Sequence, residues 1–434
     1  MDKCSVVSPD TFTRLGLDRP YMPIDAKAAV ASLKDLRALT ADENGAQRLA
    51  WSHTWLKARN WFQGKLRELA VEHHLDAAGN SWTTLAGDSP KTLILGSHLD
   101  SVPNGGWLDG ALGVLAAFAV LRRISDEYNG KPPITIRLVD WADEEGARFG
   151  RSLFGSSAFA GTHSIDQDRA RTDAGGKRLE DALAECGVSI DSIGDAQQER
   201  KNAAAYLELH IEQGPILEAM SIPLAAVLGT KGVERHAITF RGQEAHSGST
   251  PMKTRRDALA AAAKLALEIR PIASRHPDAV CTMGSLKTFP GIVTAVVGRC
   301  EATLDQRDLD AAVLAQMYRE AKEKSIQFAQ EEGCTVEWSR IWNIAPEPFH
   351  PALIQLCEES IREVAGQTHR MPSGPLHDAA EVSRSGIPTV MMFVQSLHGI
   401  SHNKIEDTRE DHLELAITAF DRLASKTMQW IKAS

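Results

Sequence analysis

Residues 91–118 read KTLILGSHLDSVPNGGWLDGALGVLAAF and carry the pattern that decides the fold. The apolar run from Thr92 to Gly96 predicts a short buried strand that continues to His98. A turn rich in glycine follows, and the Ala/Leu/Val-rich segment after Asp109 predicts a helix. His98 therefore lies at the carboxyl end of a strand and Asp109 at the start of a helix. Open α/β sheets build their sites in this crevice.

An imidazole and a carboxylate that converge in such a crevice can share a metal ion. Asp100 follows His98 by two residues and is placed to hold the other N–H group of the imidazole. One histidine and one aspartate are a weak signal for a metal site, so the rest of the chain has to supply further ligands.

The bulk composition predicts a soluble globular protein of about two domains, with 434 residues, 43% hydrophobic and 24% charged. The net charge of -9 argues against nucleic acid and anionic membranes as partners. Six scattered cysteines without a C-x-x-C pair favour a reducing compartment. The N-terminus lacks an apolar signal core, and the longest near-apolar run, residues 111–121, is too short to span a bilayer. We therefore expect a cytoplasmic enzyme.

Three further apolar runs end in polar side chains. Residues 134–139 lead into Asp143, Glu144 and Glu145, residues 204–211 contain His210, and residues 387–394 precede His398 and His402. Each run also has a simpler explanation. The acids suit a helix N-terminus, and a lone histidine is more often structural. The spacing of His398 and His402 suits a helical zinc pair, but Gly399 argues against a helix, so we expect His402 alone to be a ligand.

Taken together, these strand ends predict a site for two metal ions. Imidazoles and carboxylates suit zinc or a similar first-row ion, and five ligands with one shared carboxylate fit two ions about 3.5–4 Å apart. With Glu145 as a ligand, Glu144 is left over as the general base of a metal-assisted hydrolysis. The predicted ligands are His98, Asp109, Glu145, His210 and His402.

Residues 232–346 predict a separate inserted domain, because strands and helices alternate there in the order β-α-β-β-α-β. Residues 1–231 and 347–434 then form a discontinuous catalytic domain. Within it, residues 26–75 have a helical pattern that includes Leu66, Leu69, Ala70 and His73. Residues 1–24 show no hydrophobic periodicity. Residues 163–202 are predicted to form loops, apart from a helix over residues 179–186.

Several long motifs resemble the hydantoinase/carbamoylase branch of the di-metal aminoacylase and carboxypeptidase superfamily, over roughly residues 43 to 425. They read GSHLDSVPNGGWLDGALGVLAA, WADEEGARFGRSLFGS, ELHIEQGPILE, EAHSGSTPM, LDQRD, SGPLHDAAEVS and GISHNKIEDT. The resemblance implies an α/β fold. Its catalytic domain would be of the mixed-sheet, di-zinc aminopeptidase type, with an inserted ferredoxin-like α+β lid domain that forms a homodimer.

The resemblance also implies roles for individual residues. Asp109 would bridge the two ions, with His98 and His210 at one and Glu145 and His402 at the other. Glu144 would be the catalytic base, and Asp100 would be the second catalytic residue. Substrate contacts would come from Gln213, Arg235, His246, Arg307 and His377, and His246 would act in the partner subunit's site. Zn²⁺ is the expected ion, with Mn²⁺, Co²⁺ or Ni²⁺ as alternatives.

One departure from the family pattern concerns the segment PGIVTAVVGR. Thr294 stands where the family usually has a substrate-contacting Asn, and Val297 where Pro is common. A threonine offers one hydroxyl in place of the donors and acceptor of an amide. We therefore expect that the substrate's carboxylate end is either held differently here or is not the usual group.

The resemblance implies hydrolysis of the C–N bond of an N-carbamoyl (ureido) amino acid, which yields the amino acid, ammonia and carbon dioxide. An allantoate amidohydrolase or a related N-acyl or ureido acid amidase is the alternative, and a β-ureidopropionase is a further one. A catalytically inactive binding protein would be a different class. Such a protein predicts a damaged metal set, whereas this set is complete.

Overall fold

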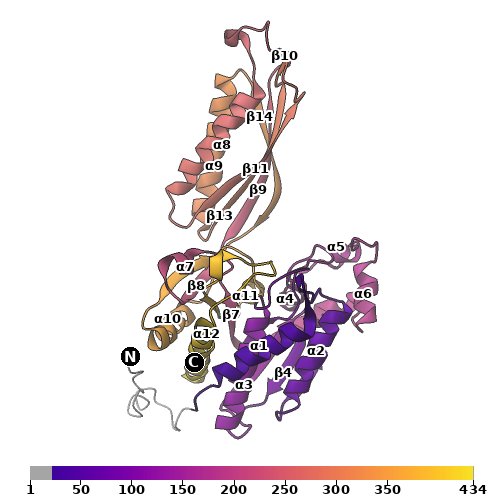
Figure 1. Cartoon of the computed structure of the whole chain (residues 1–434), viewed down its shortest axis with the longest axis vertical. Helices are drawn as coiled ribbons and strands as arrows, with labels where there is room; N and C mark the ends of the chain where they lie inside the picture. Colours follow the sequence, from indigo (N-terminus) through magenta and orange to yellow (C-terminus); the bar gives the residue numbers. More distant parts are fainter. Residues whose placement is uncertain (1–21, 434) are drawn as a thin grey trace. The chain divides into compact units, whose positions relative to one another are not determined.

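The computed structural model describes residues 22–433, which divide into two compact units (Figure 1). Unit 1 is formed by the chain up to Val227, by Phe349–Met371 and by the chain from His377 onward. Unit 2 is formed by Leu228–Pro348 and Pro372–Leu376. Of the segment 1–24, which was predicted to lack periodicity, residues 1–21 lie outside the described chain.

Unit 1 is built on a mixed sheet with the strand order β8-β17-β7-β5-β6-β4-β3. Strands β6, β5, β7 and β17 run parallel to one another, while β8, β4 and β3 pair antiparallel with their neighbours. The predicted mixed-sheet α/β class is therefore confirmed. The strand bounds are β3 Glu72–Leu75, β4 Ser81–Leu85, β5 Thr92–His98, β6 Thr135–Trp141, β7 Ala203–Ile211, β8 Leu224–Thr230 and β17 Thr389–Val394.

Helices α3, α10 and α12 pack against the central strands, and α1 contacts α3 and α12. The helices of this unit are α1 Ala26–Thr40, α2 His53–Leu66, α3 Ala111–Glu127, α4 Phe154–Ala160, α5 Ile165–Arg169, α6 Leu179–Glu185, α7 Ile216–Met220, α10 Pro351–Ala365, α11 Asp378–Arg384 and α12 Glu410–Ala433. Shorter elements are β1 Ala41–Asp42, β2 Gly45–Ala46, β16 His369–Ser373 and two 3-10 helices, η2 Ile190–Arg200 and η4 Leu397–Gly399.

The strand β5 forms because every one of its residues is buried, as its apolar sequence predicts. Gly96 is required at its centre, since a Cβ atom there would lie 2.1 Å from the backbone oxygen of Val139 on β6. The strand ends at His98, and α3 begins just after Asp109, so both predictions for this stretch are confirmed.

Unit 2 has the predicted order of elements and folds into a four-stranded antiparallel sheet, β11-β13-β9-β14. Two helices, α8 and α9, contact the sheet and enclose a core with it. This is the split βαβ arrangement of a ferredoxin-like domain. The bounds are β9 Gly232–Arg241, β10 Ala245–His246, η3 Met252–Thr254, α8 Ala258–Ser274, β11 Val280–Phe289, β12 Ala295–Val296, β13 Arg299–Asp308, α9 Ala311–Glu331, β14 Thr335–Ile344 and β15 Glu347–Pro348.

Two expectations about elements are wrong, and one alternative explanation does not apply. The helical spacing that ran through His73 stops at Leu66, and residues 72–75 form β3 because they pair with β4. Residues 163–202 contain α5 and η2 in addition to the expected helix. No helix begins at residues 143–145, so a helix N-terminus does not explain their charge. Within residues 22–433, no helix combines the length and the apolar character needed to cross a membrane.

Candidate metal centre

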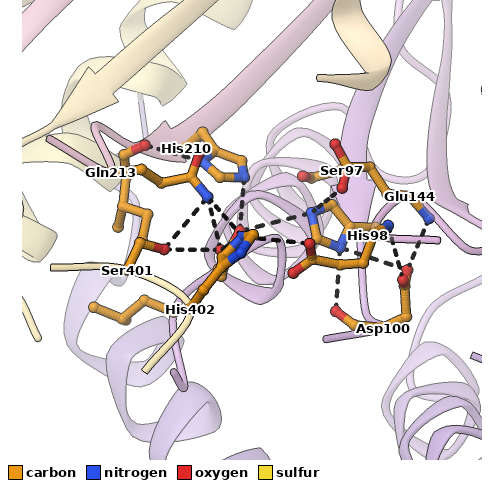
Figure 2. A network of polar contacts seen from close by, with 12 residues as sticks. Ser97, His98, Asp100, Glu144, His210, Gln213, Ser401 and His402 are labelled. Atoms are coloured by element: carbon orange, nitrogen blue, oxygen red, sulfur yellow. Dashed lines mark hydrogen bonds and ion pairs between the residues drawn. The ribbon is translucent and has the colours of Figure 1, made fainter. Parts of the chain in front are cut away.

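The carboxyl ends of the parallel strands bring the predicted metal-binding side chains together. His98 is the last residue of β5, and His210 is the last but one of β7. The loop after β6 carries Glu145, and the loop after β17 carries His402. Because the strands run parallel, these side chains meet at one edge of the sheet (Figure 2).

Asp109 lies between two groups of these side chains. Its Oδ1 atom is 3.1 Å from His210 Nε2 and 3.8 Å from His98 Nε2. Its Oδ2 atom is 3.3 Å from His402 Nε2, which is also 3.3 Å from Glu145 Oε2. Two groups that could each hold a metal ion therefore share one carboxylate: His98, Asp109 and His210, and Asp109, Glu145 and His402.

Gly110 makes this approach possible. Its φ angle of 63° lies in the left-handed region, and a Cβ atom there would lie 2.4 Å from the ring of His98. A larger residue would therefore separate the start of α3 from the end of β5.

The unpaired ring nitrogens of the two buried histidines fit a metal ion. His98 Nδ1 donates to the backbone oxygen of Asp100 at 3.1 Å, and His210 Nδ1 donates to that of Ile211 at 2.9 Å. These bonds fix the tautomer, so each Nε2 presents a lone pair to Asp109. Both Nε2 atoms, and Oε1 of Glu145, are buried without a hydrogen-bond partner among the described residues. Buried polar atoms rarely stay unpaired, so the donor set fits divalent cations.

Asp100 does more than hold His98. Its backbone oxygen accepts the imidazole N–H, while its carboxylate lies 3.5 Å away from His98 Nδ1. The carboxylate oxygens instead accept the backbone N–H groups of Glu144 at 3.2 Å and Glu145 at 3.1 Å. Asp100 therefore joins the end of β5 to the loop after β6.

Glu144 lies beside the metal groups without belonging to either of them among the described residues. It is buried, and its Oε2 atom is 3.7 Å from His98 Nε2. Burial raises the pKa of its carboxyl well above the usual value, although His98 opposes the shift. Such a carboxyl can exchange a proton near neutral pH when a cation lies close to it.

Burial and neighbouring charges shift the pKa values of the groups around Asp109. Burial disfavours the protonated form of His98, yet Glu144, Asp100 and Asp109 raise its pKa well above the usual value. The hydrogen bond with Asp109 raises the pKa of His402 to about 9. Burial raises the pKa of Glu145 to about 7. A divalent cation would favour the deprotonated forms of these groups, which are the forms that bind metal.

Two polar side chains donate hydrogen bonds to Oδ2 of Asp109. Gln213 Nε2 donates to Oδ2 at 2.8 Å, and Ser401 Oγ donates to it at 3.0 Å (Figure 2). Gln213 Nε2 also lies 3.3 Å from His402 Nε2. Gln213, which was predicted to contact substrate, is thus part of the same cluster, whereas the sequence reasoning missed Ser401.

His377 is also close to the cluster. It precedes α11, and its ring centroid is 4.4 Å from that of His210. Burial and the neighbouring His210 lower the pKa of His377 well below the usual value, so its ring is neutral. A neutral imidazole can both donate and accept a hydrogen bond.

Glu208 was missed by the sequence reasoning. Its carboxylate is fully buried and accepts hydrogen bonds from Ser97 Oγ at 2.8 Å, from Tyr206 OH at 3.0 Å and from the backbone N–H of Ala379 at 3.1 Å. These contacts tie β5 and β7 to the start of α11. An acid inside an otherwise apolar strand, two residues before His210, was the available signal.

The other predicted substrate residues lie in unit 2, where they form two pairs. Arg235 and Arg307 both contact Asp305, at 2.8 Å and 2.9 Å. His246 and Thr294 lie close together where β10 pairs with β12, since His246 is paired with Ala295 and Ser247 N–H donates to Thr294 O at 2.9 Å. Both His246 and Thr294 are exposed.

His398 lies on the 3-10 turn η4, with a left-handed φ of 57°. Its backbone N–H donates to Glu218 Oε2 at 2.8 Å, and it joins no candidate metal group of residues 22–433. His398 and His402 therefore do not form a helical pair.

A comparison with known families shows which family the chain belongs to. Residues 94–426 match the family model described as peptidase family M20/M25/M40, so the chain belongs to this family. Enzymes of the family use two metal ions, and the two groups around Asp109 could bind them. The chain is an amidohydrolase.

Characterised relatives and solved structures agree with the predicted branch. An N-carbamoyl-L-amino acid amidohydrolase from Geobacillus stearothermophilus is 35% identical over 370 residues, which cover 85% of this chain and 90% of the relative. An allantoate amidohydrolase from Escherichia coli (strain K12) is 32% identical over 386 residues, or 88% and 93% of the two chains. A hydantoinase/carbamoylase family amidase from Burkholderia multivorans superposes with a TM-score of 0.82 at 31% identity, over 94% and 98% of the chains.

Proposed function

We propose that this enzyme hydrolyses the carbamoyl C–N bond of an N-carbamoyl (ureido) amino acid. The observation that carries the proposal is the sharing of Asp109 between two groups of histidines and carboxylates. The names of several relatives describe this activity. The products are the free amino acid and a carbamate, which decomposes to ammonia and carbon dioxide.

An allantoate amidohydrolase or a related N-acyl or ureido acid amidase is the second candidate. Two relatives, 32% and 31% identical, bear the name allantoate amidohydrolase. The exposed Thr294, in place of the family's usual Asn, favours a changed contact at one end of the substrate.

We assign two divalent ions to each subunit, with Zn²⁺ first and Mn²⁺, Co²⁺ or Ni²⁺ as alternatives. His98 and His210 would hold one ion, Glu145 and His402 the other, and Asp109 both. The ions would polarise the substrate carbonyl and increase the acidity of water. The fixed Nδ1 bonds of His98 and His210 keep both rings in the orientation that binding requires.

Glu144 is the proposed general base. It accepts a proton from the attacking water and returns it to the leaving nitrogen, so the C–N bond breaks without release of an unstable anion. Asp100 positions Glu144 through the backbone N–H group. Gln213 and the neutral His377 are proposed to contact the substrate, because both side chains lie beside the cluster.

Unit 2 is proposed to be the inserted lid domain. Arg235 and Arg307 would bind the substrate's carboxylate, Thr294 would contact the substrate, and His246 would act in the partner subunit's site within a homodimer. A cytoplasmic location fits the five free cysteines of the described chain.

A substrate panel tests the proposal. Metal-free protein would be reloaded separately with Zn²⁺, Mn²⁺, Co²⁺ or Ni²⁺ and assayed for ammonia and free amine from N-carbamoyl amino acids, allantoate and N-acyl amino acids. The highest kcat/KM is expected for an N-carbamoyl amino acid. Faster hydrolysis of allantoate or an N-acyl acid would favour the second candidate function. If no substrate is hydrolysed with any of the ions, both candidate functions are refuted.

A further inference from the structure

A short hairpin near the start of unit 1 lies along the loop that joins β5 to α3. Its two strands, β1 and β2, pair antiparallel, and Ala46 on β2 forms a bridge with Gly105 in the loop. Ala46 N–H donates to Gly105 O at 2.8 Å, and Gln47 Nε2 donates to Asn104 Oδ1 at 2.8 Å. The loop connects two predicted metal ligands, so these contacts affect how the two ligands are placed.

The hairpin also reaches the loop after β17. Lys404 follows the predicted ligand His402 by two residues, and its Nζ atom donates to Glu43 O at 3.4 Å. Gly45 is required at this contact, because its φ angle of 123° favours glycine. A Cβ atom at Gly45 would lie 2.6 Å from Gly105 O and 2.9 Å from Lys404 Cβ. The hairpin therefore contacts loops that carry residues of both metal groups.

Arg48, which follows the hairpin, holds the first residues of the loop after β5. Its Nε atom donates to Leu99 O at 2.7 Å. Its backbone N–H donates to Ser101 Oγ at 3.1 Å, and its backbone O accepts Ser101 N–H at 3.0 Å. On the other side, Asp140 Oδ1 on β6 accepts Leu99 N–H at 2.8 Å. Both peptide groups of Leu99 are therefore held by charged side chains from outside the loop.

Leu99 separates two residues whose orientation matters to the metal centre. His98 precedes it and is a predicted ligand. Asp100 follows it and accepts the backbone N–H groups of Glu144 and Glu145. A shift of Leu99 would therefore tilt the imidazole of one metal group. It would also move the loop that carries the proposed base and a ligand of the other group.

The guanidinium group of Arg48 lies beside the acids of the metal centre. Arg48 is fully buried, and its Nη2 atom has no hydrogen-bond partner within residues 22–433. Burial lowers the pKa of Arg48, while the negative charges of Glu406, Asp100 and Asp109 oppose that shift. A neutral replacement would therefore remove both a positive charge near these acids and the hydrogen bond of the Nε atom.

We propose that Arg48 is a positioning residue of the metal centre, which holds the turn after β5 so that His98 faces its ion and Asp100 holds the loop of Glu144. The inference rests on the two ions assigned under the proposed function, but it does not depend on which substrate is hydrolysed. Arg48 touches neither the ions nor the substrate in this role, since it acts through the backbone of Leu99 and Ser101.

The test compares ion affinity in Arg48→Met and the wild type. Methionine keeps an unbranched side chain but removes the donors. Dissociation constants for Zn²⁺ would be measured by competition with a chromophoric chelator. Arg48→Met should bind at least one ion about tenfold more weakly, the lower end of the usual effect of losing a residue that orients ligands. Unchanged affinities in folded Arg48→Met protein would overturn the proposal.

The direction of the change separates positioning from charge. Loss of a nearby positive charge would by itself strengthen the binding of a cation, because like charges repel. Weaker binding in Arg48→Met therefore reports the lost hydrogen bonds, and tighter binding would overturn the proposal.

Arg123→Met is the matched control. Arg123 is another buried arginine of unit 1, and its carboxylate partners, Glu127 and Asp421, lie outside both metal groups. This variant should be less stable in urea yet keep the wild-type ion affinities. Equal losses of affinity in Arg123→Met and Arg48→Met would mean that the loss of any buried arginine weakens the centre, which would overturn the proposal.

Ser101→Ala is a milder variant in case Arg48→Met does not fold. It removes only the side-chain acceptor of Arg48 N–H. The ion affinity should fall about fivefold, the factor that corresponds to one lost hydrogen bond. An unchanged affinity would count against the proposal.

Hydrogen exchange in the metal-free protein needs neither ion nor substrate, so it remains informative if the wild type binds no ion or hydrolyses no ureido acid. The amides of Ala46 and Ser101 join the hairpin segment to the loop. In Arg48→Met they should exchange about fivefold faster than in the wild type. Arg123→Met should leave them at the wild-type rate. Wild-type rates in Arg48→Met would reject the positioning role, whatever the substrate.

Discussion

Glu406 holds Asp109 in place through the backbone. Its Oε1 atom accepts the N–H groups of Asp109 and Leu108, both at 3.1 Å. Its Oε2 atom accepts Ser401 Oγ at 2.8 Å, one residue before His402. A single buried carboxylate therefore fixes the start of α3 and the loop after β17, which carry residues of both metal groups.

We expect Glu406→Ala to lower metal affinity about 10–100-fold, the usual effect of removing a residue that orients ligands. Gly106→Ala should give the same result, because a Cβ atom at Gly106 would lie 2.0 Å from Glu406 Cδ. Metal content after dialysis against a weak chelator measures the effect. Glu410→Gln, which changes an exposed glutamate on α12, is the control. Full metal retention in both Glu406→Ala and Gly106→Ala would contradict the positioning role.

Glu144→Gln should reduce kcat about 10²–10⁴-fold while leaving metal content nearly unchanged. The amide keeps the size of Glu144 but cannot accept the water's proton. Elemental analysis beside the activity assay separates the outcomes. Loss of metal would make Glu144 a ligand, and retained activity would remove it from the mechanism.

Substitution of a predicted ligand should instead remove metal and activity together. His98→Ala, His210→Ala and His402→Ala are each expected to lose at least one ion, because each withdraws a nitrogen directed at Asp109. His398→Ala is the matched control, since its side chain joins no metal group among residues 22–433. If His398→Ala alone loses metal, the assignment of His402 as the ligand is wrong.

The strand-end residues could be predicted because each follows a local apolar run. The burial of β5, for example, is visible in its own seven residues. Glu406 could not be found this way, and the one local signal for Glu208 was its acid side chain inside an apolar strand. Glu406 bonds Leu108 from 298 residues away, and Glu208 bonds Ser97 from 111 residues away, so no local pattern shows these contacts.

The error near His73 has a related cause. Helical spacing continued past Leu66, but the chain there becomes β3 because it pairs with β4 after the turn at Gly79. Tertiary pairing thus outweighed a weak local preference. The strand β8 was overlooked although its apolar residues 224–227 gave a local signal.

A buried ion pair should stabilise unit 1 without affecting catalysis. Arg123 Nε on α3 donates to Asp421 Oδ1 on α12 at 2.8 Å, and both side chains are nearly inaccessible to solvent. Asp421→Ala removes this partner, while Glu127 Oε2 still accepts from Arg123 Nη1 at 2.7 Å, so the free energy of unfolding in urea should fall by about 1–3 kcal/mol. Asp88→Ala removes an exposed ion pair with Lys131 and should cause little change. Equal stabilities of the two variants would contradict this account.

The proposed homodimer makes a further prediction about His246, which is exposed on β10 in unit 2. Its Nδ1 atom accepts the backbone N–H groups of Gly248 and Ser249 at 3.1 Å and 3.2 Å, so Nε2 is the nitrogen available to a ligand. If that nitrogen serves the partner subunit's site, a variant that lacks it should bind metal normally yet hydrolyse poorly.

Mixing two inactive variants tests whether His246 acts across subunits. Glu144→Gln and His246→Ala chains would be combined and allowed to exchange. In a mixed dimer, one site has its own intact Glu144 and also receives the partner's intact His246. Random pairing makes about half of the dimers mixed, each with one competent site, so about a quarter of wild-type activity should return. Glu144→Gln mixed with Glu144→Gln is the control. If verified exchange restores no activity, His246 serves its own subunit or the enzyme does not form this dimer.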